Sequence, residues 1–471
     1  MLSFSFSSQA LISQTFNTIN GNAPYLTFDN GQTKVTSLND ELFKITLSDG
    51  REITPVTNRS STAPIVLPNL GETLADVNMA VPNGSNSVKL SSLIGAPYNY
   101  WGDDDGDDDF TISGDLNLII TDKNNQNVAR NARLDICNAP YKVTLSNTDA
   151  ILKTRYGVPD GTNINTRSVT YYINPKVSPK VCFAKPNTVD VEVGHNFDGP
   201  ADMWNRQRGY IPQATYDSSF PTTGANEMHF FLDLGGVVEP LIWKEVKRGG
   251  ITVKAGYDVD SHGEIVNATM VRVTLKGPSA TPEQWKTDEP GSVDKPDLPQ
   301  TFELVGRYDD NGPVIVKYGF VLQQWLVNRG DMKTKHGRAA KWCENIGYRQ
   351  PKVKDLTNAF CRPNYPHCRG SEGASPASDD NYFVRRIGGG FFSEWGNLSE
   401  RGTFYDSQKI HFLEYGYWSS ELGDDGNPDP NIEDLDKKPW LDVYSRDGAS
   451  GWNYPRENGG AYGLCIWPGS N

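Results

Sequence analysis

The chain has 471 residues and a formal net charge of −13, from 58 acidic and 45 basic side chains. Because domains usually hold roughly 100–200 residues, this length predicts three or four of them. The negative charge would repel phosphate backbones and no long basic stretch offsets it, so nucleic acid is excluded as an expected partner.

The first two thirds of the chain are predicted to be mostly β. Apolar residues alternate with polar ones in three runs, as in half-buried strands. These runs are Leu116, Leu118 and Ile120; Val169, Tyr171 and Ile173; and Val271, Val273 and Leu275. Turn dipeptides such as Asn83-Gly84, Asp160-Gly161 and Asn311-Gly312 separate them, which is typical of β-sandwiches.

Shifts in composition predict the domain boundaries. The acidic run 103–109 precedes one sandwich-like segment, a proline-rich stretch at 175–186 closes it, and further prolines blur the end of the next segment. We therefore expect four domains, at 1–95, 96–189, 190–311 and 312–471.

The last third changes character. Ala339, Trp342, Cys343 and Ile346 have the i, i+3, i+4, i+7 spacing of an amphipathic helix. The segment 462–466 alternates as a half-buried strand does. Each of these two predicted elements contains one cysteine.

The six cysteines form no C-x-x-C pair, so three disulfides are preferred to a zinc or redox site. Six cysteines allow several connectivities, and free thiols in a cytosolic protein remain an alternative. Disulfides would instead indicate an exported protein. The start of the chain lacks a secretory signal pattern, and no apolar run reaches the ~18–20 residues of a spanning helix. The spacing favours the pairs Cys137–Cys182, Cys343–Cys465 and Cys361–Cys368.

Several motifs of the chain resemble those of known protein families. The segments 337–351, 417–421 and 462–467 resemble a C-type-lectin-like domain, and 96–108 and 219–224 resemble segments of an enterobacterial branch of adhesins. Together they are similar to intimin/invasin-type adhesins, which are inverse-autotransporter passengers. The resemblance implies tandem immunoglobulin-like β-sandwiches followed by an α+β C-type-lectin-like domain.

The resemblance also implies a function. It predicts a monomeric virulence-associated adhesin, outside the cell on the bacterial outer membrane or secreted, that binds a receptor on a host or neighbouring cell through its C-terminal tip. The receptor is a cell-surface protein or a glycan.

Binding is expected in the loops of the tip, where aromatic residues are dense. Trp395, Trp452 and Tyr454 are flanked by Gly, Asn and Arg and are predicted to be exposed, with Tyr444 and Arg369 as further receptor contacts. The alternative is that these residues fill the core of a strand-poor fold. Trp418 and Trp467 are the expected core members.

No cofactor or metal is expected. Asp424, Asp425, Asp429 and Asp442 are weak calcium candidates, because Asn427-Pro-Asp and Trp440-Leu-Asp only approach the motifs of sugar-binding lectins. In the acidic run 103–109 the glycine comes fourth rather than sixth, which disfavours an EF-hand, so a solvated linker is preferred to a calcium site.

The chain is predicted not to be an enzyme. Its six histidines are scattered, and it has neither a His-x-x-x-His nor a Gly-x-Ser-x-Gly arrangement. Four alternatives to an anchored adhesin stay open: a secreted, non-anchored virulence effector, a calcium-dependent glycan-binding lectin, a relative of formylglycine-generating enzymes, and a purely structural surface protein.

Overall fold

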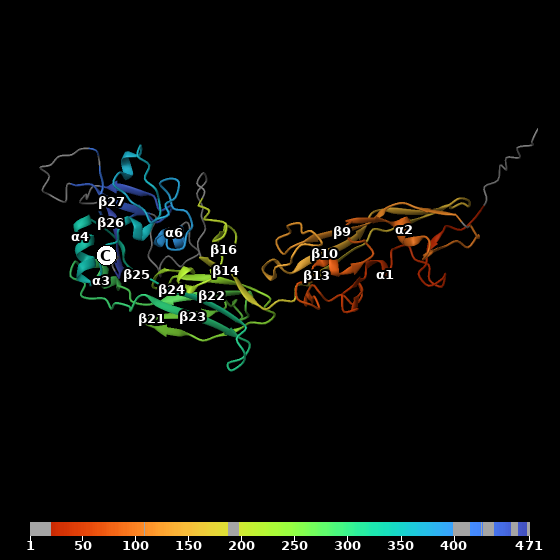
Figure 1. Cartoon of the computed structure of the whole chain (residues 1–471), viewed down its shortest axis with the longest axis horizontal. Coiled ribbons are helices and arrows are strands. Elements are labelled where there is room, and N and C mark those ends of the chain that lie inside the picture. Colours follow the sequence, from red (N-terminus) through yellow and green to blue (C-terminus); the bar gives the residue numbers. More distant parts are fainter. Residues whose placement is uncertain are drawn as a thin grey trace, which may run out of the picture. The chain divides into compact units, whose positions relative to one another are not determined.

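A computed structural model of the chain describes residues 20–107, 109–186, 197–398, 415–424, 426, 438–453 and 460–468. The chain divides into two compact units, Met1–Val177 and Ser178–Asn471, each built mainly of strands (Figure 1). The mostly β fold class expected from the sequence is therefore confirmed. In the described part of the chain, no helix is both long and apolar enough to cross a membrane.

Within residues 20–107 and 109–177, the N-terminal unit forms four sheets. From one edge to the other, the five-stranded sheet consists of β4 (Ile65–Val66), β13 (Ser168–Asn174), β10 (Tyr141–Asn147), β9 (Asp115–Thr121) and β6 (Ser87–Lys89). The three-stranded sheets consist of β12 (Gly161–Ile164), β11 (Ala150–Thr154) and β8 (Phe110–Ile112), and of β3 (Glu52–Ile53), β2 (Ile45–Thr46) and β5 (Asn78–Met79). The smallest sheet pairs β1 (Tyr25–Leu26) with β7 (Trp101–Gly102). The helices of this unit are α1 (Asp40–Phe43), η1 (Leu74–Asp76), α2 (Leu90–Ile94) and η2 (Ile136–Asn138).

One hydrophobic core fills this unit and explains its strands. Along β10 and β11 every second residue is buried, which is the pattern of strands with one face on a core. The core takes residues from both sides of the boundary predicted at 95/96, because the N-terminal segment packs Phe43 and Ile45 onto the same sheet. The buried Tyr171 hydroxyl donates to the Phe43 carbonyl oxygen at 2.6 Å across that boundary. Residues 1–95 thus form no separate compact unit.

In the part of the C-terminal unit that the structure describes, the strands form three sheets. From one edge to the other, the seven-stranded sheet consists of β15 (Trp204–Asn205), β16 (Gly209–Tyr210), β14 (Lys180–Pro186), β18 (His229–Gly235), β22 (Met270–Lys276), β21 (Ile251–Gly256) and β20 (Val246–Arg248). The three-stranded sheet consists of β19 (Ile242–Trp243), β23 (Gln300–Arg307) and β24 (Val316–Leu322). The six-stranded sheet consists of β17 (Thr223–Ala225), β25 (Gln324–Thr334), β29 (Ala461–Trp467), β26 (Gly416–Leu422), β27 (Trp440–Tyr444) and β28 (Ser450–Asn453). The helices of this unit are η3 (Tyr216–Ser218), α3 (Pro282–Lys286), α4 (His336–Asn345), α5 (Val353–Leu356), η4 (Pro366–Cys368) and α6 (Phe391–Trp395).

The boundary predicted at 311/312 does not separate two sheets. Asn311-Gly312 lies in the turn between β23 and β24, which pair from Gln300↔Leu322 to Gly306↔Val316. The turn signal therefore marks a hairpin, and the chain changes sheet only after Leu322. The boundary predicted at 189/190 lies outside the described residues.

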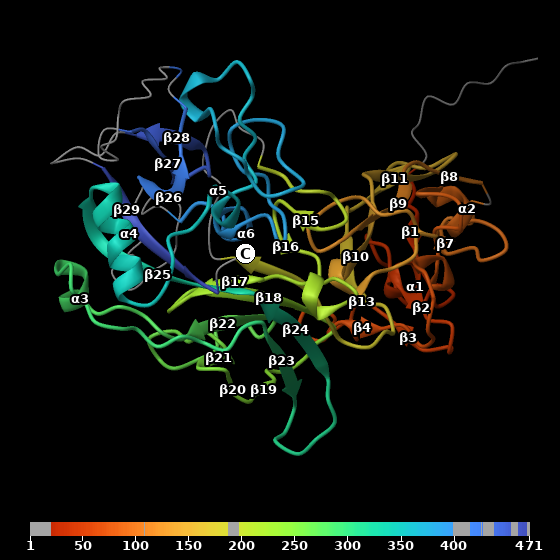
Figure 2. The ribbon, with the colours of Figure 1, turned by 60° about the vertical axis from the view of Figure 1, so that its left-hand side comes forward.

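We call residues 324–468 the tip module; it contains α4 and every strand of the six-stranded sheet except β17, and Figure 2 shows it from a second side. The predicted helix is confirmed as α4, whose Ala339, Trp342 and Cys343 are buried. The predicted terminal strand is β29, but it is buried on both faces rather than one. It is an inner strand, between β25 and β26, and α4 packs against it.

A buried carboxylate of the tip module binds β17 and the residue that precedes this strand. Glu394 in α6 is fully buried and accepts hydrogen bonds from the backbone and hydroxyl groups of Thr222 and Thr223 and from the Gly388 amide. Burial raises the pKa of Glu394, while these hydrogen bonds act to lower it. The Arg385 side chain, 1% exposed, donates to the Glu394 carbonyl oxygen at 3.1 Å. The tip module shares one continuous core with the seven-stranded and three-stranded sheets of the C-terminal unit.

Candidate receptor-binding surface

Two disulfides hold the tip module. Cys343 in α4 bonds Cys465 in β29 across 122 residues, with the two Cα atoms 5.4 Å apart. Cys361 bonds Cys368 and closes a short segment, residues 361–368, that we call the Cys loop. Both pairs match the pairing favoured by the spacing. In the chain-entropy model the long bridge contributes about 4–5 kcal/mol and the short one about 2–3 kcal/mol.

Cys137 and Cys182 are also disulfide-bonded, so all six cysteines are oxidised. Disulfides form and persist in oxidising compartments, which supports an exported protein and disfavours the cytosolic alternative.

Trp452 lies against the Cys loop. It sits on β28, the edge strand of the sheet, and its indole N–H donates to the Pro366 carbonyl oxygen at 2.8 Å. The His367 and Trp452 rings lie 5.7 Å apart between centroids. A Cβ atom at Gly423 would come within 2.6 Å of the Trp452 Cβ, so the absence of a side chain there lets the two segments approach. The indole is therefore fixed in place but still partly exposed.

Arg369 follows the Cys loop directly and carries an exposed positive charge. Its guanidinium lies 3.9 Å from the Asp424 carboxylate, and its carbonyl oxygen accepts from the Asp424 amide at 2.9 Å. The side chains are 44% and 57% exposed, so this ion pair contributes less than about 1 kcal/mol. Arg369 can exchange that partner for an acidic group on another molecule at little cost.

Tyr444, on β27, also lies near the Cys loop, but it projects from the other face of the sheet, because Trp452 pairs with Leu441. Gly451 lies between Tyr444 and the Cys loop. A Cβ atom built at Gly451 would lie 3.8 Å from the Tyr444 ring and 3.9 Å from the His367 carbonyl oxygen. Tyr444 is 37% exposed. We call Trp452, His367, Arg369 and Tyr444 the tip surface.

A buried acid lies beneath the tip surface. Asp442 on β27 is 2% exposed, and a Cβ at Gly416 would lie 2.2 Å from its carboxylate, so the group is enclosed by the neighbouring strands. Burial raises the pKa of Asp442 to about 7, although a hydrogen bond from the Asn453 side chain favours the charged form. The charge of Asp442, followed by burial, raises the pKa of Tyr444.

The calcium candidates do not assemble into a described site. Asp424 is exposed and paired with Arg369, whereas Asp442 is enclosed. Asp425 and Asp429 lie outside the described residues. Across the residues that the structure places, no three His, Cys, Asp or Glu side chains gather where they could hold a metal ion.

Two carboxylates of the acidic run, those of Asp104 and Asp105, bind protein groups from residues 22–34. Asp104 binds Lys34 and accepts from the Tyr25 hydroxyl at 3.2 Å, and Asp105 accepts from the Asn22 amide. These groups fasten the run to the start of the first unit.

The prediction that Trp395 is exposed is wrong. Trp395 ends α6, is 0% exposed, and donates its indole N–H to the Thr223 carbonyl oxygen at 3.0 Å. Its ring packs edge-on against Phe220, 5.0 Å away. The spacing of Phe391, Phe392 and Trp395 was a helical signal that the neighbouring glycines obscured.

The remaining predictions for this region have mixed outcomes. Trp418 is fully buried, as expected, and Trp467 is partly buried. Tyr454 lies outside the described residues. His367 was not predicted as part of the surface; the signal was its position between a proline and a cysteine in a short closed loop.

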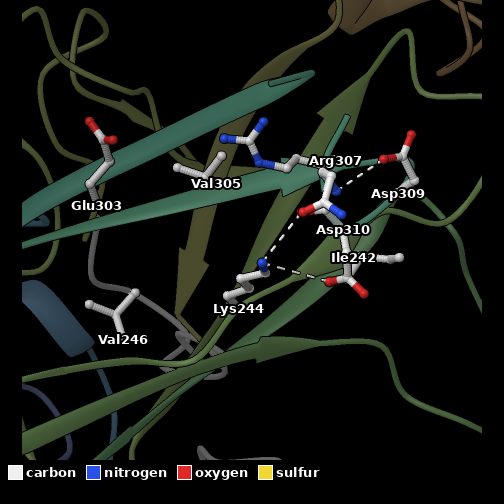
Figure 3. Close-up of a pocket in the computed structure, with 9 residues that line it drawn as sticks. Ile242, Lys244, Val246, Glu303, Val305, Arg307, Asp309 and Asp310 are labelled. Carbon is white, nitrogen blue, oxygen red and sulfur yellow. Dashed lines mark hydrogen bonds and ion pairs between the residues drawn. The ribbon is translucent and has the colours of Figure 1, made fainter. Parts of the chain in front are cut away.

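A separate hollow of about 460 Å³ lies beside β19, β20 and β23 (Figure 3). Ile242, Val246 and Val305 supply its apolar lining, and Lys244 pairs with Asp310 at 3.9 Å across one side. Its lining residues come from β19, β20 and β23 and the turn after β23, not from the tip module.

No protein-family model matches the chain, and no curated protein matches it. Among solved structures, the chain aligns with invasin, a bacterial integrin-binding protein, at 13% identity and a TM-score of 0.31, over 76% of this chain and 50% of invasin. It aligns with a 282-residue C-terminal intimin fragment, solved with the intimin-binding domain of its translocated receptor, at 12% identity and a TM-score of 0.29, over 76% and 86% of the two chains. An intimin mutant of EHEC O157:H7 aligns at 13% identity and a TM-score of 0.26, over 60% and 97%. The chain thus spans about half the length of the invasin structure.

Proposed function

We propose that this chain is the passenger of an extracellular adhesin, which binds a protein receptor on another cell through the tip surface. In this proposal the tip module is a C-type-lectin-like domain, and immunoglobulin-like sandwiches precede it, as the sequence resemblance implies. The observation that carries the proposal is the fixed contact between Trp452 and the disulfide-closed Cys loop.

A surface that is already ordered loses less entropy when it binds. The Cys loop cannot open while its disulfide is intact, and Trp452 is held by its hydrogen bond to Pro366. Loops carried on a rigid sheet are common binding sites. The tip surface therefore has the order that a specific contact requires.

The chemistry of the tip surface favours a protein receptor over a calcium-bound sugar. Trp, Tyr and Arg are the residues that most often supply the binding energy of protein interfaces, and Trp452, Tyr444 and Arg369 all lie around the Cys loop. The indole N–H of Trp452 is already bonded, so its remaining apolar surface is what a partner would cover. Arg369 would attract an acidic group of that partner.

The test is binding of the full chain to epithelial cells, measured by flow cytometry. Tyr444→Ala is compared with Tyr308→Ala, because both tyrosines are 37% exposed and only Tyr444 belongs to the tip surface. We expect Tyr444→Ala, and more strongly Trp452→Ala, to weaken binding about tenfold or more, while Tyr308→Ala binds as the unchanged chain does. Equal binding by all variants would overturn the proposal.

A further inference from the structure

A hollow of about 470 Å³ lies in the N-terminal unit, well apart in sequence from the tip surface. It is lined by residues from α1, β2, β5 and α2, from the residues that directly follow α1 and β5, and from the segment after α2. Its volume falls within the roughly 300–1,000 Å³ typical of ligand sites. It also uses Tyr98 and Tyr100, from a motif for which the proposed function has no role.

The two tyrosines form an ordered aromatic wall. Their rings are stacked, with centroids 5.4 Å apart and an interplanar angle of 17°, and Phe28 packs behind Tyr100 at 4.9 Å. The Tyr98 amide donates to the Gly95 carbonyl oxygen at 2.9 Å, and the Tyr100 amide donates to that of Ile94 at 2.7 Å. Tyr98 is nevertheless 57% exposed. The turn made by these two backbone hydrogen bonds thus keeps the Tyr98 ring exposed to solvent in a defined position.

The remainder of the hollow combines a small apolar floor with polar groups. Met79 and Leu93 are partly buried and form part of the floor. Asn78 and Thr46 contribute an amide and a hydroxyl, and Glu41 contributes a carboxylate that is 55% exposed. The hollow therefore places hydrogen-bonding groups alongside an aromatic ring.

We propose that this hollow binds a neutral saccharide. A sugar ring presents C–H groups on its face, which pack on an aromatic ring, and hydroxyls at its edge, which bond to amide, hydroxyl and carboxylate groups. Tyr98 supplies the ring, and Asn78, Thr46 and Glu41 supply the polar partners. The site belongs to the N-terminal unit and does not depend on the function proposed for the tip surface.

The charges around the hollow favour a neutral sugar over an acidic one. The Lys44 ammonium is shared between Glu41 at 2.8 Å and Glu52 at 3.0 Å, so these three groups carry a net charge of −1. The chain as a whole carries −13. A sialylated or sulfated saccharide would be repelled.

A proline-rich peptide fits the hollow less well. Grooves for such peptides are lined by aromatic rings that grip successive prolines. Here the aromatic residues come from one segment, and the residues of α1 and β2, including Glu41, Lys44 and Thr46, offer mostly polar groups instead.

The test uses the full chain and saturation-transfer NMR, with chitotriose and N-acetyllactosamine as neutral probes. Sialylated N-acetyllactosamine is the acidic probe, and a proline-rich peptide is the competing class. Tyr98→Ala removes the aromatic wall, and Tyr156→Ala is the matched control, because Tyr156 is 54% exposed in the same unit and does not line the hollow. Tyr98→Phe keeps the ring.

We expect at least one neutral probe to bind, with the affinity reduced about tenfold or more in Tyr98→Ala and little changed in Tyr156→Ala and Tyr98→Phe. The melting temperature of Tyr98→Ala should stay close to that of the unchanged chain, since most of the ring is already in water. The proposal is overturned if neither neutral probe binds, if the sialylated probe or the peptide binds more tightly, or if both alanine variants lose binding equally.

Discussion

Asp442 offers the sharpest test of the tip geometry, because a buried acid makes stability depend on pH. Its pKa is about 7 in the folded chain and 3.8 in the ordinary case. A raised folded pKa contributes stability that is fully present below pH 3.8 and is lost as pH rises through 7. At 1.36 kcal/mol per pKa unit, the loss between pH 4 and pH 8 is about 4 kcal/mol.

Asp442→Asn removes the titration while keeping the shape of the side chain. We expect the variant to gain stability relative to the unchanged chain as pH rises from 4 to 8. Because 1 kcal/mol shifts the melting temperature of a large domain by about 2–4 °C, the relative gain is about 8–16 °C. Thermal melts followed by circular dichroism at several pH values would measure it.

The control for this experiment is Asp424→Asn. The Asp424 side chain is 57% exposed. The melting temperature of Asp424→Asn should therefore differ from that of the unchanged chain by the same amount at each pH. If the difference for Asp442→Asn is also the same at each pH, Asp442 is not enclosed as described, and the packing of β26, β27 and β28 around it is refuted.

Three further predictions concern structural contacts. Glu394→Ala leaves the buried amides of Thr222 and Thr223, and the Gly388 amide, without their acceptor and should lower the free energy of unfolding by about 3–6 kcal/mol, whereas the exposed Glu344→Ala should change it by less than about 0.5 kcal/mol in the same denaturant melts. Arg130→Ala removes donors to three carbonyl oxygens in the N-terminal unit and should cost about 1–3 kcal/mol, against little for the exposed Arg133→Ala; equal melts would contradict this role. Replacing both cysteines of the Cys loop by serine should cost about 2–3 kcal/mol and weaken cell binding, and unchanged binding would show that the loop is not needed.

The sequence predicted elements whose pattern depends on local spacing. The predicted helix around Trp342 and the predicted strands around Leu118, Tyr171 and Val273 are confirmed. The spacing of their apolar residues indicates an element with one face packed on a core, and this spacing can be read from local sequence alone. The cysteine spacing also favoured two bridges that formed.

What the sequence could not predict depends on distant neighbours. Trp395 looked exposed because glycines surround it, yet a residue 172 positions earlier in the chain accepts its hydrogen bond. The domain boundary expected at 311/312 coincides with the Asn311-Gly312 turn, and the two strands that this turn joins pair along their length. Local composition identifies a turn but not whether it separates domains. The contact between Trp452 and Pro366 joins residues 86 positions apart and has no local signal.

The central claim is that the tip surface binds a protein on another cell. The most direct measurement is cytometry of the full chain carrying Tyr98→Ala, so that the saccharide site does not contribute, on cells treated with protease, with glycosidases or with a calcium chelator. The account predicts that protease treatment of the cells abolishes binding and that glycosidases and chelator leave it intact. Binding that survives protease but is lost with glycosidases or chelator would contradict a protein receptor.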